Sequence, residues 1–121
     1  MGKDRLPQPG SPAPNVTPEQ MDLPITLDSQ GNFVTLRQFL MPANGPAPLP
    51  PETLNSDQWA ELTMKRLEAQ PLFEVVMLEA GHVDQKRAIQ EVRTRTNVGK
   101  AMIEIQQLVV EDLLERLDHN Y

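Results

Sequence analysis

The stretch RTRTNVGKAMIEIQQLVVEDLLERL, residues 93–117, decides the fold more than any other part of the sequence. It begins polar and basic and continues as a run of apolar and acidic residues. On a helical wheel its apolar side chains cover an arc of about 240°, whereas a helix with one buried face needs about 100°. One neighbour cannot cover such an arc. The stretch therefore predicts either the central helix of a compact bundle or a helix buried against another protein chain.

The continuity of this helix is the first open question. Asp84 is expected to open it, and it either runs unbroken to about Leu117 or breaks near Gly99. An unbroken helix of 34 residues would be about 51 Å long, which exceeds the width of a small domain. Helix-poor residues cluster between Thr94 and Gly99. We favour one long helix with a weak point there, and a hinged hairpin is the alternative.

The residues before it predict two short helices. Ser56 is a good N-cap, and apolar residues then recur at helical spacing up to Gln70. After Pro71, residues 72–80 are apolar on most sides and predict a second helix, which Gly81 would end. The β-branched pair within this run leaves a buried strand as the alternative.

The first half of the chain has a different composition, because eleven of the twelve prolines precede Glu52. We expect an extended, disordered arm over residues 1–22 and a Pro-rich linker over residues 42–55. Between them, residues 23–41 predict a small hairpin at 24–36, with an extended arm and a turn as the alternative, followed by a short helix capped by Thr35. Residues 56–121 form the helical module, so the predicted fold class is mainly α.

Composition indicates that this module is only marginally stable by itself. The chain has 121 residues, only 4% of them aromatic, and much of its length is proline-rich. A small core of this kind is usually stabilised by a partner or by oligomerisation. There is no cysteine, so neither a disulfide framework nor a thiolate site is predicted.

Charge is polarised along the C-terminal segment. Residues 83–100 contain five basic and two acidic side chains, and residues 101–118 contain one basic and five acidic ones. Antiparallel pairing with a second helix would place Arg93 and Arg95 near Glu111 and Glu115 of that helix. The net charge of −6 argues against sequence-independent binding to nucleic acid. The basic residues from Arg87 to Arg95 leave a nucleic-acid-associated packaging or regulatory factor as a third interpretation of the function.

The chemical motifs in the sequence are incomplete. Gly99 and Lys100 resemble the end of a phosphate-binding loop, but Thr94 stands where that loop needs glycine and Ala101 where it needs a hydroxyl. The two histidines, His82 and His119, lie far apart and have no cysteine to complete a zinc site. We therefore predict no catalytic site, metal or cofactor, and a protein that is not an enzyme.

The predicted function is that of a non-catalytic structural or adaptor subunit of a larger protein assembly, such as a virion or phage-type particle, which binds other subunits, self or heterologous. The alternative is an accessory subunit of a multi-subunit enzyme. Neither a signal peptide nor a membrane span is recognisable, so cytoplasmic or particle-bound residence is expected. The predicted helix-packing interface consists of Trp59, Phe73, Met102, Ile105, Val109 and Leu113. Electrostatic contacts are predicted for Arg87, Arg93, Arg95, Glu111 and Glu115.

Overall fold

A computed structural model describes residues 16–41, 45–78 and 80–119. The described part contains five α-helices, one 3₁₀ turn and two antiparallel hairpins, so the fold is mixed α/β rather than mainly α as predicted. In chain order the elements are α1 (Pro18–Met21), β1 (Pro24–Leu27), β2 (Phe33–Thr35), α2 (Leu36–Leu40), η1 (Pro51–Thr53), α3 (Ser56–Ala69), β3 (Glu74–Met77), β4 (Gly81–Asp84), α4 (Gln85–Arg93) and α5 (Asn97–His119).

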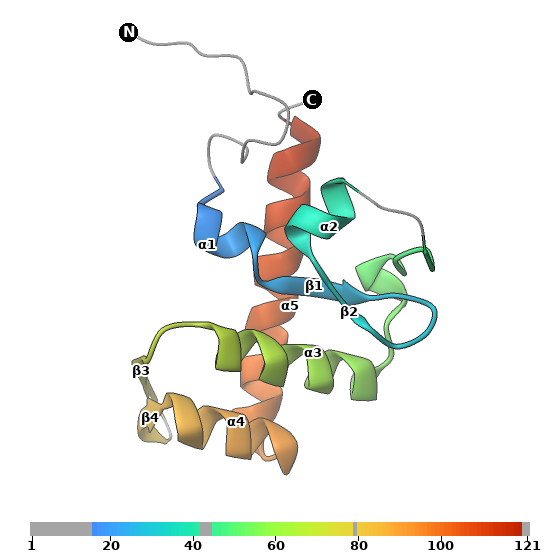
Figure 1. Cartoon of the computed structure of the whole chain (residues 1–121). Coiled ribbons are helices and arrows are strands. Elements are labelled where there is room, and N and C mark those ends of the chain that lie inside the picture. Colours follow the sequence, from blue (N-terminus) through green and yellow to red (C-terminus); the bar gives the residue numbers. More distant parts are fainter. Residues whose placement is uncertain (1–15, 42–44, 79, 120–121) are drawn as a thin grey trace, which may run out of the picture.

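Helix α5 runs through the molecule, and the other elements are arranged along it (Figure 1). One core cluster joins its C-terminal half to the first hairpin, α2 and α3, and includes Ile25, Trp59 and Val110. A second cluster joins its N-terminal half to α3, β4 and α4, and includes Leu67 and Met102. The predicted arc from residue 98 to 117 contains eleven apolar side chains, and nine of them are buried or partly buried within the chain. The central-helix interpretation therefore accounts for most of the arc.

The first hairpin confirms the expectation for residues 24–36. Strand β1 pairs antiparallel with β2, and Gly31 adopts a φ of 86° in the connecting turn. The Asp28 carboxylate accepts hydrogen bonds from the backbone N–H groups of Gln30 and Asn32 at 2.8 and 2.9 Å. The Thr35 hydroxyl then caps α2, as predicted, by accepting from the backbone N–H of Gln38 at 3.1 Å.

Both Pro-rich segments contact the rest of the chain where they are described. The Thr26 hydroxyl donates to the carbonyl of Leu49 at 2.6 Å, and the Leu49 N–H donates to the carbonyl of Leu27 at 2.8 Å. The predicted arm ends at residue 22, whereas residues 18–21 form α1 and Met21 is buried; residues 1–15 lie outside the described residues. The division into four segments itself remains a prediction.

The second hairpin corrects the predicted helix over residues 72–80. Residues 74–77 form β3, which pairs in continuous register with β4 from Glu74 opposite Asp84 to Met77 opposite Gly81. β-Branched residues favour the extended conformation, and Gly81 adopts a φ of 72°, which suits the turn between the strands. The strand alternative is thus correct in type, although β3 is exposed rather than buried.

The predicted unbroken helix over residues 84–117 is also wrong, because a tight turn separates α4 from α5. Arg95 adopts a positive φ of 55°, and the Thr96 hydroxyl accepts from the backbone N–H of Gly99 at 3.0 Å. Gly99 lies directly against α4, since a Cβ built on it would lie 2.8 Å from Val92 Cα and closer still to the Glu91 carbonyl. Glycine at this position therefore permits close packing of two helices.

Helix α3 corresponds to the helix predicted from Ser56 to Gln70, and its bounds match that prediction closely. Its N-cap is Asn55, one residue before the predicted Ser56, and the Asn55 side chain accepts from the backbone N–H of Gln58 at 2.8 Å. Asp84 caps α4 as predicted, by accepting from the backbone N–H of Arg87 at 2.8 Å. Among the described residues, no helix combines the length and apolarity needed to cross a lipid bilayer.

Candidate interaction surface

The six predicted interface residues lie in different environments. Trp59, Met102 and Leu113 are buried within the chain's own core clusters, where each is only 5% exposed. Phe73 and Val109 are partly buried against the same clusters, and Ile105 is 46% exposed. Of the six, Ile105 is therefore the residue most available to a partner in this conformation.

The residues predicted to make electrostatic contacts lie in two places. The arginines lie on α4 and in the turn that follows it, and the glutamates lie on α5. Arg95 Nη2 lies 3.1 Å from Asp57 Oδ1, so this arginine joins the turn between α4 and α5 to the start of α3. Arg93 lies on α4 and donates to the Gln90 side chain at 3.2 Å. Glu111 and Glu115 are exposed on α5, which gives this helix an acidic outer side.

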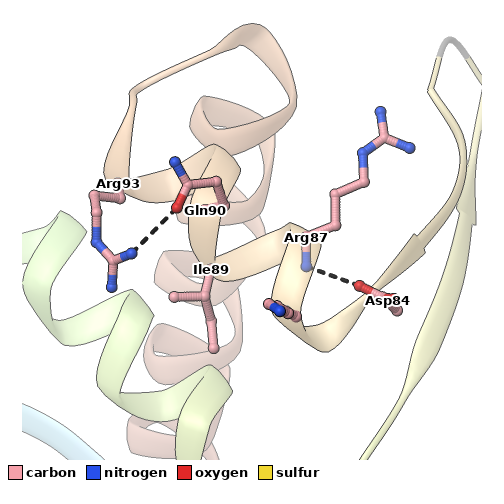
Figure 2. A pocket seen from close by; sticks show the side chains of 6 residues that line it. Asp84, Arg87, Ile89, Gln90 and Arg93 are labelled. Atoms are coloured by element: carbon pink, nitrogen blue, oxygen red, sulfur yellow. Dashed lines mark hydrogen bonds between the residues drawn. The ribbon is translucent and has the colours of Figure 1, made fainter.

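The Arg87 side chain contacts both the second hairpin and its own helix. Its Nη1 donates to the carbonyls of Ala80 and His82 at 3.2 and 3.0 Å, and its Nε lies 3.4 Å from Glu91 Oε2. Figure 2 shows its side chain leaving α4 on the side of the hairpin, at a pocket that Ile89 and Arg93 also line. The guanidinium is thus engaged with the outer edge of β4.

Exposed apolar side chains gather on the second hairpin and on the adjoining part of α5. Leu72 is 90% exposed, Val76 73% exposed, and Leu78 fully exposed. We call this set the hairpin surface: Leu72, Val75, Val76, Leu78 and Ile105. Isolated exposed apolar residues are common, but such a group is typical of a protein-binding surface.

A shallow apolar groove lies beside this surface, between the hairpin and α5. Its volume is about 310 Å³, and its lining includes Phe73, Val75, Met102 and Ile105. The groove combines strand and helix side chains, so the helix predicted over residues 72–80 could not reveal it. The sequence signal for it is the run from Leu72 to Leu78, in which every residue except Glu74 is apolar, so that both faces of a strand there carry apolar side chains.

The outer edge of β3 provides unbonded backbone groups. The Gln85 N–H donates to the Phe73 carbonyl at 3.1 Å, so Phe73 and Gln85 continue the β3–β4 register by one hydrogen-bonded position just beyond the ladder. Hydrogen-bonding direction alternates along a strand, which turns the N–H and C=O groups of Glu74 and Val76 away from β4. In the described part of the chain, no other backbone or side-chain group bonds to them.

The outer edge of β1, unlike that of β3, is covered by other parts of the chain. Pro48 forms a bridge with Asp28, Leu49 bonds to both Thr26 and Leu27, and the ladder shifts register after Pro24. Proline, covering segments and bulges are ways in which proteins protect sheet edges from further pairing. Strand β3 has no proline, lysine or bulge. The edge of β3 is therefore less protected than the edge of β1.

The buried Arg66 side chain has structural contacts. Arg66 is 1% exposed, and its Nε and Nη1 donate to Gln106 Oε1 and to the Pro24 carbonyl, each at 2.8 Å. Burial lowers the pKa of Arg66 to about 10, so the side chain stays protonated at neutral pH. Hydrogen bonds from Thr96 and Arg87 lower the pKa of the Glu91 carboxyl. These contacts join elements of the fold rather than form an acid–base pair.

The residues described in the structure contain no group of three or more His, Cys, Asp or Glu side chains placed to hold a metal ion. Comparison with known proteins finds no matching family model, no matching curated protein and no matching solved structure. The hairpin surface and the adjoining edge of β3 are therefore the candidate docking site of the chain.

Proposed function

We propose that this chain is a non-catalytic structural or adaptor subunit of a larger protein assembly, and that it docks through the hairpin surface. The observation that supports this function is the coincidence of exposed apolar side chains with an unprotected strand edge. Leu72, Val76 and Leu78 would lose apolar surface on docking, and the free N–H and C=O groups of Glu74 and Val76 would gain partners. Strand addition of this kind takes its affinity from backbone hydrogen bonds and its specificity from side chains.

The marginal size of the fold also supports assembly. A two-stranded hairpin is at best marginally stable in water, and β3 and β4 form a sheet of only two strands. Val83 on β4 is fully buried, whereas Val75 opposite it on β3 is 38% exposed. Further strands or side chains placed against β3 would complete the burial of this part of the hairpin.

The test is the mass and composition of the native complex that contains the chain. A tagged chain, produced at native level in the cells that make it, would be purified and its subunit stoichiometry measured by native mass spectrometry. We expect a defined complex for the unaltered chain and for Met41→Lys, which changes an exposed apolar residue outside the hairpin surface. Val76→Lys should lose the complex.

Recovery of the chain as a free 13.6 kDa monomer from those cells would overturn this proposal. Equal recovery of the complex with Val76→Lys and Met41→Lys would show that docking does not use the hairpin surface. Circular dichroism of both variants would establish that each has kept its fold.

A further inference from the structure

We propose that the partner at the β3 edge is a second copy of this chain, and that two β3 strands pair antiparallel to form a four-stranded sheet. This inference rests on the proposed function, because it names the occupant of the same docking surface. The order of strands would be β4, β3, β3 of the second copy and β4 of the second copy. Each copy would contribute the same edge, as a two-fold symmetric interface requires.

The two edges of the hairpin differ, and this difference determines which one pairs. Carbonyls of Ala80 and His82 face outward from β4, and both accept from Arg87 Nη1 at 3.2 and 3.0 Å. On β3 the corresponding outward groups belong to Glu74 and Val76, and no described group bonds to them. In a pair formed through β3, the outer edges of the four-stranded sheet are thus the two β4 edges capped by Arg87, so strand pairing through this sheet stops at two copies.

The sequence of β3 selects one register for self-pairing. If Val75 lies opposite Val75 of the second copy, Glu74 faces Val76 of that copy, and the outward backbone groups of these two residues bond in both symmetry-related pairs. A shift that places Glu74 opposite Glu74 would oppose two carboxylates, which is destabilising. The shift in the other direction places Val76 opposite Val76 as the single outward pair within the strand, because Glu74 would then face Leu78 beyond the strand end.

The side chains around the strand are self-complementary in this register. Leu72 of one copy lies opposite Leu78 of the other, and both are almost fully exposed in the single chain. The Glu74 carboxylate keeps its intramolecular neighbour, His82, whose Nδ1 lies 3.5 Å from Glu74 Oε2. Pairing of two copies therefore covers apolar surface without placing a carboxylate opposite another carboxylate.

Light scattering coupled to size exclusion, over a range of loading concentrations, tests this dimer. The mass of the full chain should rise from 13.6 kDa toward twice that value and then stay constant. Val76→Pro removes an outward N–H without removing a β3–β4 ladder bond, so it should leave a folded monomer. Val76→Thr keeps the N–H and the β-branched shape and is the matched control, which should still dimerise.

Hydrogen exchange followed by NMR gives a second readout that needs no variant. On raising the concentration, exchange of the Glu74 and Val76 amides should slow by about tenfold or more as they enter hydrogen bonds. The His82 amide lies on the opposite edge of the hairpin and should keep its rate. Slowing of His82 instead, or unchanged exchange of Glu74 and Val76 in a dimer, would overturn pairing through β3.

The two proposals fail in different ways. A chain that stays monomeric at every concentration refutes self-pairing, while a defined complex with other proteins in cells would still support the adaptor function and would indicate a strand from a different protein. A purified dimer that is also the only species in cells would support self-pairing and refute the larger assembly.

Discussion

Arg66 Nε donates a 2.8 Å hydrogen bond to Gln106 Oε1, and this buried contact joins the last turn of α3 to the middle of α5. The same guanidinium donates to the Pro24 carbonyl at the start of β1. One side chain therefore connects three elements that are far apart in the sequence. A buried cation is costly unless its donors are satisfied, which makes Gln106 the residue on which Arg66 depends.

Gln106→Leu should destabilise the fold by about 1.5–3 kcal/mol, because a charged donor loses its acceptor inside the protein. The measurement is urea unfolding followed by circular dichroism. Gln107→Leu is the matched control, since Gln107 is the next residue of the same helix and has no contact with Arg66 among the described hydrogen bonds. Equal effects of the two substitutions would contradict a specific role for the bond.

Gly99→Ala should destabilise the chain by about 2 kcal/mol or more, since the added methyl group meets the α4 backbone. Helix propensity alone predicts the opposite sign, because alanine is favoured over glycine by about 1 kcal/mol in a helix interior. Lys100→Ala, at the next and exposed position, provides the control. Stabilisation by Gly99→Ala in thermal unfolding would show that the two helices can separate at little cost.

Thr26→Val should destabilise the fold by about 1–2 kcal/mol, because the Leu49 carbonyl loses the hydroxyl that donates to it at 2.6 Å. Protease cleavage between residues 45 and 50 should also become faster, since this bond holds the segment against β1. Thr53→Val removes a bond of similar length, 2.7 Å, from an exposed hydroxyl and should have a smaller effect. Unchanged cleavage would mean that backbone contacts alone hold the segment.

Asp28→Asn should reduce the loss of stability that the chain undergoes in acid. Backbone hydrogen bonds, the one from Asn32 foremost, lower the pKa of the Asp28 carboxyl below its ordinary 3.8. The carboxylate therefore stabilises the fold above the unfolded-state pKa, and this contribution is lost as the pH falls through the folded-state pKa. Urea unfolding of both proteins between pH 6 and pH 2 should give converging stabilities. Parallel curves would contradict this assignment.

Arg87→Ala should change the closed dimer into larger species, because the substitution frees the carbonyls of Ala80 and His82 at the β4 edge. Light scattering should then give masses above that of a dimer, and the masses should increase with concentration. Arg93→Ala is the control, since Arg93 lies on the same helix and does not contact the hairpin in the described structure. A dimer that remains intact in Arg87→Ala would mean that this cap is not needed for closure.

Local sequence signals predicted the elements whose cause is local. The cap at Thr35, the glycine turn at Gly31 and the helical spacing after Ser56 are short-range features, and the structure contains the corresponding helix, hairpin and helix. The weak point between Thr94 and Gly99 was also visible, because poor helix formers cluster there. The sequence pattern does not show whether these poor helix formers bend a continuous helix or end it.

The tertiary structure alone decided the outcome where one local pattern allows two conformations. The run from Leu72 to Leu78 is apolar enough for a helix or a strand, and its pairing with β4 selected the strand. Helix α4 ends at Arg93 and the chain turns at Arg95, so that α5 packs back on α4 through Gly99. A sequence pattern does not place these residues in space. The sequence by itself therefore determined most of the segments that form regular structure, with α1 and the 3₁₀ turn η1 as exceptions. Tertiary packing decided which apolar side chains are covered and left Val76 exposed on an open edge.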